Sequence, residues 1–186
     1  MRKMKGGTMK SQYRIFLILT VLLVLIMNTN AMAESDVKPI QLSLWHPLQI
    51  YDAESSITGF RFSLIYGRNQ DLTGVDIGLV NRITGSIQGI QGGFVNLVDG
   101  DLTGIQSGFV NVVKNNVLGY QSGFFNSAKD LTGMQLGIIN SCESAAGIQF
   151  GIYNSTNKLN GLQIGLLNFN WSGKPYTFLP IVNWSF

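Results

Sequence analysis

Histidine, cysteine and proline are scarce in this sequence, which has one histidine, one cysteine and four prolines among 186 residues. The lone cysteine, Cys142, has no partner for an intramolecular disulfide, so packing and hydrogen bonds must hold the fold. The only histidine, His46, lies far from Cys142 in the sequence. We therefore expect Cys142 to fill a repeat position held elsewhere by small residues, and not to act as a catalytic nucleophile.

Charged residues make up only 12% of the chain, and its basic excess is confined to the N-terminus. Residues 1–14 contain five basic residues and no acidic one, an apolar run follows over 15–27, and Ala31-Met32-Ala33 ends the segment. These are the three parts of a secretory signal peptide, so we expect cleavage after Ala33. The run is shorter than the roughly 20 residues of a spanning helix, which argues against a membrane anchor.

Removal of residues 1–33 changes the charge of the chain. The remaining 34–186 keep eight basic residues against ten acidic ones, a net charge of −2. This balance gives no support for a nucleic-acid partner, because such binding needs a clustered basic surface. We expect 34–186 to form a single β-repeat domain in an exported protein.

The chain repeats the pattern apolar-Gln-x-Gly-apolar-apolar-Asn every 14 or 15 residues. Val75–Asn81 is the same with Asp76 in place of Gln, and the degenerate copies Ile40–His46, Phe60–Tyr66 and Thr177–Asn183 bring the total to ten units. The residues that define the six clear copies are Gln91, Gly93, Asn96, Gln106, Gly108, Asn111, Gln121, Gly123, Asn126, Gln135, Gly137, Asn140, Gln149, Gly151, Asn154, Gln163, Gly165 and Asn168.

Each unit has the alternation of a β-strand. Met134, Leu136 and Ile138 alternate with Gln135 and Gly137, so one face is apolar and the other carries Gln and Gly. A further glycine precedes most units and lies on the Gln face, which permits close approach of another backbone. A helix is unfavourable because each glycine costs about 1 kcal/mol in a helix interior. The sequence therefore predicts an all-β fold.

The strands carry almost no charge, whereas the turns between them are charged. Arg61 and Asp76 are the only charged residues within the ten units. We expect a small outer-membrane β-barrel. Such barrels have an even number of strands of about 9–11 residues, and ten units of 14 or 15 residues would supply ten strands of about this length with short turns. Its apolar face would meet lipid and its Gln and Gly face would line the lumen. The alternating end of the chain, up to Phe186, resembles the last strand of such barrels, with Pro180 as the departure.

A β-solenoid is the alternative, because stacked coils align identical residues into ladders of Asn and Gln. Gln106, Gly108, Asn111 and their equivalents resemble the repeat of curlin, although curlin units are longer and contain two strands each. A sheet assembly outside the membrane is the third possibility.

The run of repeat units behind a signal peptide, which ends in Pro-Ile-Val-Asn-Trp-Ser-Phe, resembles bacterial surface repeat-containing proteins over about residues 40–186. These proteins are exported and have no assigned chemistry. The resemblance implies a location at the cell surface or outer membrane of a Gram-negative-type bacterium, and it carries no catalytic residue over to this chain.

Arg61 and Asp76 occupy the Gln position in neighbouring units and form the only candidate polar pair. We expect both to be solvated near a rim, and a pair inside a lumen is the alternative. Asp99 and Asp101 flank a glycine, and we interpret them as turn residues and not as a cation site. No spacing indicates paired catalytic carboxylates, a metal site or a phosphate loop.

These observations predict no enzyme activity, no cofactor, no metal and no small-molecule substrate. The expected role is that of a surface or outer-membrane repeat protein with a structural, adhesive or minor pore function. The alternative is an extracellular solenoid or fibre-forming surface protein. The expected partners are outer-membrane lipid, a second copy of the chain or another surface component.

Overall fold

The computed structural model describes residues 37–186, and the predicted signal peptide (1–33) lies outside the described residues. Among residues 37–186 no helix has the length and apolar character needed to cross a membrane. The strands are β1 (Val37–Trp45), β2 (Leu48–Gln49), β3 (Ser56–Asn69), β4 (Leu72–Ile83), β5 (Ile87–Val98), β6 (Leu102–Val113), β7 (Asn116–Phe150), β8 (Tyr153–Asn170) and β9 (Phe178–Ser185).

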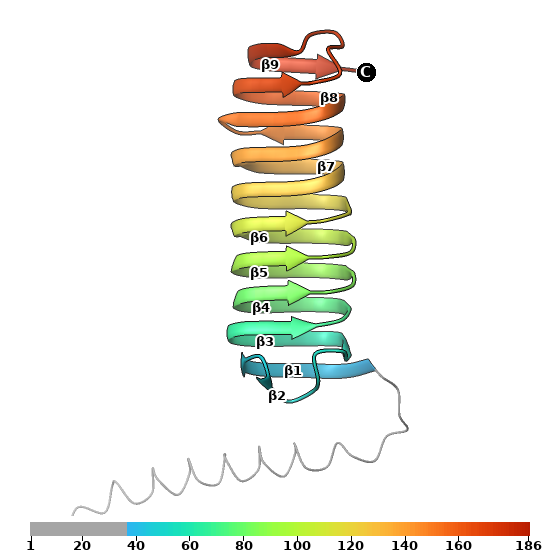
Figure 1. Cartoon of the computed structure of the whole chain (residues 1–186), viewed down its shortest axis with the longest axis vertical. Helices are drawn as coiled ribbons and strands as arrows, with labels where there is room; N and C mark the ends of the chain where they lie inside the picture. Colours follow the sequence, from blue (N-terminus) through green and yellow to red (C-terminus); the bar gives the residue numbers. More distant parts are fainter. Residues whose placement is uncertain (1–36) are drawn as a thin grey trace, which may run out of the picture. The chain divides into compact units, whose positions relative to one another are not determined.

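Successive repeat units stack on one another as coils of a β-solenoid (Figure 1). Strands β3 to β8 pair in parallel with their neighbours along the chain. In β4, β5 and β6, Asn81 lies opposite Asn96, which in turn lies opposite Asn111. Each coil therefore returns the chain to the same point one repeat later. The alignment of the seven regular units made from the sequence is confirmed, and the stack contains about nine coils. The alignment of the degenerate copy Phe60–Tyr66 is wrong at its end, because Gly67 and not Tyr66 lies opposite Asn81.

The expectation of a β-barrel is wrong, and the solenoid alternative is confirmed. A barrel of consecutive strands joined by short turns requires antiparallel pairing. Here the neighbouring units are parallel, and the Gln face lines a filled interior in place of an open lumen. The apolar face of each unit points outward.

Two glycine positions shape each coil. Gly104 has φ +131°, and a Cβ there would lie 2.0 Å from the carbonyl oxygen of Gly89 in the coil before. A Cβ on Gly108 would lie 2.5 Å from Nδ2 of Asn96. The first glycine position allows a backbone conformation that L-residues rarely adopt, and the second leaves room for the asparagine side chain.

The interior of a coil has an apolar half and an amide half. In β6, Leu102 and Val113 are buried, as are Gln106 and Asn111 between them along the chain. The apolar cluster consists of Ile57, Leu72, Ile83, Ile87, Val98, Leu102, Val113, Val117, Ala128, Leu131, Cys142, Ala145 and Leu159. The amide half contains the Gln and Asn residues that define the repeat.

The coil shortens from 15 to 14 residues in the second half of the stack. In β6 and β7 the register pairs Asn111 with Asn126, and in β7 and β8 it pairs Asn140 with Asn154. The 14-residue coils have one residue fewer in the charged turn. Because the backbone stays extended through these shorter turns, β7 continues for 35 residues.

Antiparallel segments cover the two ends of the sheet. At the first coil, β2 pairs antiparallel with β1, and Gln41 exchanges two hydrogen bonds with the backbone of Tyr51, at 2.8 and 3.1 Å. At the last coil, β9 pairs antiparallel with β8. The tenth repeat unit, Thr177–Asn183, is thus a cap and not a coil. Within it, Pro180 lacks a backbone donor and Ile181 has φ +71°, features that blunt an edge strand.

Two adjacent glycines provide a matched test of the packing. We expect Gly93→Ala to lower the free energy of unfolding by about 1–3 kcal/mol, because its Cβ would lie 2.5 Å from Nδ2 of Asn81 and from the carbonyl oxygen of Gly78. Gly92→Ala should change it by less than about 0.5 kcal/mol, because no atom lies within 4 Å of that Cβ. Urea unfolding followed by far-UV circular dichroism measures both. Equal losses in the two variants would contradict the inward position of Gly93.

Candidate functional site: a ladder core and an apolar flank

The Gln side chains form a continuous hydrogen-bonded ladder along the stack. Each Gln donates Nε2 to Oε1 of the Gln one coil earlier, at 2.8–2.9 Å, from Gln163 through to Gln91. Gln91 then donates to Oδ2 of Asp76 at 2.8 Å. A carboxylate only accepts, so Asp76 sets the orientation of Gln91 and hence of every amide after it.

The Asn side chains form a second ladder that runs in the opposite sense. Each donates Nδ2 to Oδ1 of the Asn one coil later, at 2.8–3.0 Å, from Asn81 through to Asn168. Asn168 donates to the carbonyl oxygens of Gly165 and Leu179, the latter in the cap strand β9. The dipoles of the two ladders therefore oppose each other.

Each ladder leaves one buried acceptor without a hydrogen-bond partner among the described residues. These acceptors are Oε1 of Gln163 and Oδ1 of Asn81, at the starting ends of the two ladders. A directional chain of amides must have one such end. The two atoms are explained by the ladders and do not mark a binding site.

Arg61 and Asp76 end the Gln ladder as a buried ion pair. Both side chains are inaccessible to solvent, and two hydrogen bonds of 2.7 and 2.6 Å join the guanidinium to the carboxylate. Arg61 also donates to Oδ1 of Asn69 and to the carbonyl oxygen of Arg82. The expected solvated position near a rim is wrong, and the two residues meet inside the core.

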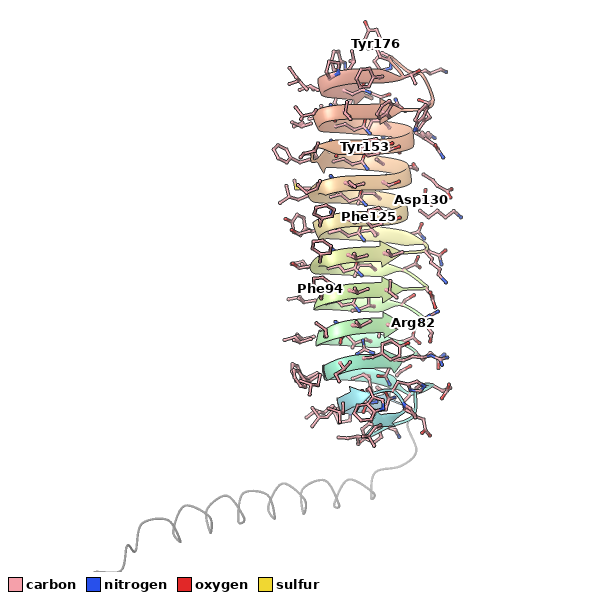
Figure 2. The ribbon with its side chains drawn as sticks, turned by 60° about the vertical axis from the view of Figure 1, so that its left-hand side comes forward. Arg82, Phe94, Phe125, Asp130, Tyr153 and Tyr176 are labelled. Carbon is pink, nitrogen blue, oxygen red and sulfur yellow. The ribbon has the colours of Figure 1, made fainter. Side chains whose placement is uncertain are left out.

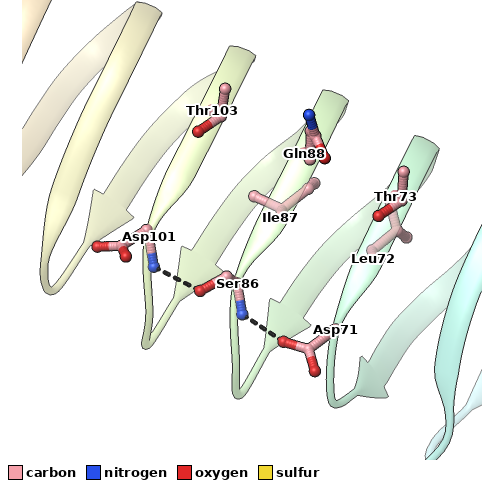
Figure 3. Close-up of a pocket in the computed structure, with 8 residues that line it drawn as sticks. All are labelled: Asp71, Leu72, Thr73, Ser86, Ile87, Gln88, Asp101 and Thr103. Carbon is pink, nitrogen blue, oxygen red and sulfur yellow. Dashed lines mark hydrogen bonds between the residues drawn. The ribbon is translucent and has the colours of Figure 1, made fainter.

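The charged turns form the edge of the stack that Figure 3 shows in close-up. The backbone N–H of Ser86 donates to Asp71, and that of Asp101 donates to the Ser86 hydroxyl, at 2.7 and 3.0 Å. The same pattern continues where the N–H of Asn116 donates to Asp101. A hollow of about 430 Å³ beside these turns is lined by residues of this ladder, including all three of its acceptor side chains.

Asp99 forms ion pairs with Lys114 and Arg82, at 2.7 and 2.9 Å. The hydrogen bond from Lys114 is the largest cause that lowers the pKa of Asp99, with a further contribution from Arg82. This contribution to stability is present above the ordinary carboxyl pKa of 3.8 and is lost as the pH falls below it. Asp99 and Asp101 thus contact different partners. No group of His, Cys, Asp and Glu in the described part of the chain is arranged to hold a metal ion.

Cys142 occupies the same column as Ile83, Val98 and Val113 and is buried. Burial raises the pKa of its thiol from 9.0 to about 11, which is opposite to the change that activates a nucleophilic cysteine. The only histidine, His46, packs against Tyr66 in the first coils. Cys142 lies six coils further along the stack, about 29 Å away at roughly 4.8 Å per coil.

An apolar flank covers one side of the stack. It consists of the three outward positions on either side of Gln and Gly in each unit, which are Ile105, Ser107 and Phe109 in β6. Its large exposed side chains are Ile40, Leu42, Leu44, Phe60, Phe62, Leu64, Ile77, Leu79, Ile90, Phe94, Ile105, Phe109, Phe124, Leu136, Ile138, Phe150, Ile152 and Leu166. They are between 36% and 63% exposed, and no charged residue occupies these positions in β1 or β3 to β8.

Figure 2 shows how charge and apolar surface are separated. Phe94 lies at one side of the stack, whereas Arg82 and Asp130 lie at the other. Monomeric soluble proteins rarely expose a contiguous apolar patch of more than a few hundred Å². The flank is therefore the candidate functional surface of the described residues.

Comparison of the chain with protein-family models, with curated proteins and with solved structures found no match. The resemblance to surface repeat proteins therefore depends on the repeat pattern alone.

The sequence indicated which residues repeat, but it did not settle two features of the site. The contact between Arg61 and Asp76 was the less favoured alternative, although opposite charges occupy equivalent positions one repeat apart, and parallel stacking places them together. The apolar face was recognised but assigned to lipid around a barrel. Its position on the outside of a filled solenoid required the parallel topology.

The ion pair can be tested by restoring the repeat consensus. Arg61→Gln or Asp76→Gln alone leaves one buried charge unpaired and should lower the free energy of unfolding by about 3–5 kcal/mol. The double variant removes both charges and extends the Gln ladder, so it should recover most of that loss. Urea unfolding of all four chains gives the coupling free energy. Additive losses in the double variant would contradict the pairing.

Cys142 should be unreactive in the folded chain. At pH 8 its raised pKa lowers the thiolate fraction about 100-fold relative to a thiol of pKa 9.0, and burial excludes the reagent as well. Alkylation by iodoacetamide, followed by mass spectrometry, should be at least about 100-fold slower in buffer than in denaturant. A Cys142→Ala, Lys129→Cys chain, whose thiol lies in an exposed charged turn, is the control. Rapid labelling of native Cys142 would contradict its buried position.

Proposed function

We propose that this chain is an exported, non-enzymatic structural protein of the bacterial surface, which assembles with a partner through its apolar flank. The observation that carries the proposal is the flank itself, an apolar surface without charge that runs along the stack. A surface of this extent is typical of proteins that associate with another apolar surface.

The sequence supports export. Residues 1–33 have the basic, apolar and Ala-x-Ala parts of a signal peptide, and the repeat pattern resembles that of surface repeat proteins. The absence of a disulfide pair is compatible with this location, because the buried amide ladders and backbone pairing supply cross-links between every coil and the next.

The packed core supports a structural role. Most of its buried polar side chains are amides, and its one ion pair is fully buried. The only cysteine has a raised pKa and lies far from the only histidine. A pore needs an open lumen, whereas inward side chains fill the interior of this stack. The proposed function therefore does not include a pore.

A fibre formed by end-to-end stacking is the second candidate, and the Gln and Asn ladders favour it because identical coils stack in amyloid-like assemblies. The ends of the stack argue against it. Strand β9 caps the last coil with an antiparallel segment that contains Pro180, and β2 covers part of the first coil. We therefore favour discrete units that associate through their sides.

Export can be tested by producing the full chain in a Gram-negative host. We expect a product that begins at Glu34, measured by intact mass, and that protease added to intact cells digests. The control is the same chain without residues 1–33, which should remain inside the cells and be protected. An unprocessed full-length chain retained in the cytoplasm would contradict the proposed location.

A further inference from the structure

We propose that the partner of the apolar flank is a second copy of this chain, and that the two stacks associate side by side as a parallel dimer. The inference deepens the proposed function, because it names the partner of the same surface. It depends on three features of the flank, which are its relief, its area and its lack of charge.

The relief begins with a ridge of three phenylalanines. Phe94, Phe109 and Phe124 stack on one another in successive coils, with ring centroids 5.0 and 4.8 Å apart. They are 54%, 45% and 44% exposed. The equivalent positions in other coils carry Leu or Ile. The ridge therefore lies only over the coils of β5, β6 and the first coil of β7.

A trough lies beside the ridge in the same three coils. Its residues are Gly92, Ser107 and Ser122, two positions before each phenylalanine, whereas the equivalent positions in all other coils carry Leu, Ile or Phe. No atom lies within 4 Å of a Cβ built on Gly92. A hollow of about 610 Å³ extends from Ser122 between these two columns toward Phe150. In each of these three coils, a small residue of the trough thus lies beside a phenylalanine of the ridge.

A two-fold axis parallel to the stack makes the ridge and the trough complementary. Rotation about such an axis exchanges the two sides of the flank and keeps the height along the stack. Phe109 of one copy then faces Ser107 of the second copy, and the same match occurs in the coils above and below. An axis perpendicular to the stack would place ridge on ridge. The self-complementary contact of a two-fold dimer therefore requires parallel stacks in register.

The area of the flank is sufficient for a stable dimer. Nine coils at about 4.8 Å extend over about 43 Å, and the three columns with their side chains are roughly 15 Å wide. The planar area is about 650 Å² per copy, of which the ridge and trough columns that face each other make up about two thirds. The accessible area is larger because of the side-chain relief. This is comparable to the roughly 800 Å² that each partner buries in a standard interface.

The charge pattern favours a second copy over a lipid surface. Peripheral membrane binding combines an apolar surface with Lys and Arg near its margin, which attract anionic headgroups. Residues 37–186 contain eight basic and eight acidic residues, and Arg82 and Asp130 lie across the stack from Phe94 (Figure 2). Nothing in the flank columns supplies a basic margin.

The test is sedimentation equilibrium of residues 34–186, which contain the whole compact unit Asp36–Phe186, so the result does not depend on export. We expect a mass of two chains for the unaltered protein. Ser107→Phe should raise the dissociation constant at least about ten-fold, because it fills the trough. Phe is compatible with the fold at this column, since Phe62 and Phe150 occupy it in other coils. Ser141→Phe, in the outward column that contains Phe169, adds the same area elsewhere and should leave the dimer intact.

A swap of the two side chains tests the register directly. Phe109→Ser alone removes part of the ridge and should also weaken the dimer. The double variant Ser107→Phe, Phe109→Ser exchanges the large and the small side chain within one coil. The two-fold axis then again places the large side chain of one copy against the small side chain of the other. We expect it to dimerise more tightly than either single variant. Circular dichroism melting of each variant separates loss of association from loss of folding.

Four outcomes would overturn the proposal. These are a single-chain mass at all concentrations, a dimer unaffected by Ser107→Phe, growth into end-to-end fibres, and binding to anionic phospholipid vesicles that Ser107→Phe strengthens. The last result would identify a lipid surface as the occupant, because added apolar area strengthens lipid binding but obstructs the trough. A cytoplasmic location in the export experiment would remove the proposed surface role and leave the dimer untouched.

Discussion

The pairing of buried amides between coils is the interaction on which the rest of this structure depends. Gln106 and Asn111 point into the interior, where an unpaired amide would cost far more than a paired one contributes. Each finds its partner in the equivalent residue of the next coil, at 2.8 Å. This is possible only if coils stack in parallel and in register. Parallel pairing, the constant spacing from Gln to Asn within each unit and the glycine packed against each Asn side chain are all consequences of this requirement.

The ladders also determine where the core tolerates a charge. A row of amides that donate in one direction ends best on a group that only accepts, and Asp76 is such a group. Its buried charge then needs a cation in the next position, which Arg61 supplies with two hydrogen bonds. The opposite ladder ends on backbone carbonyls, one of them in the cap strand. The Arg61–Asp76 pair and the cap strand thus both terminate amide rows, at opposite ends of the stack.

The sequence was sufficient to predict the strands, the units and the inward position of Gln, but not the way the units pair. The period of two placed Met134, Leu136 and Ile138 on one face and Gln135 on the other, which the structure confirms. The error lay in Asn140, which shares the phase of the apolar residues and would have pointed toward lipid in a barrel. In the structure the chain turns a corner between Ile138 and Asn140, so that the Asn points inward with the Gln. A strand pattern read as straight cannot show such a corner.

The same corner explains why so much apolar surface lies outside. When amides occupy the interior, the alternating positions that are apolar must face outward, and only the columns of Leu102 and Val113 remain to form an apolar core. Apolar side chains stabilise a fold only when they are buried. Much of the apolar surface of this chain therefore contributes no stability within one copy. A surface with this property gains stability from any partner that covers it. The Phe94 to Phe124 ridge lies beside small residues in the same coils. This relief is the reason for proposing a second copy of the chain as the partner.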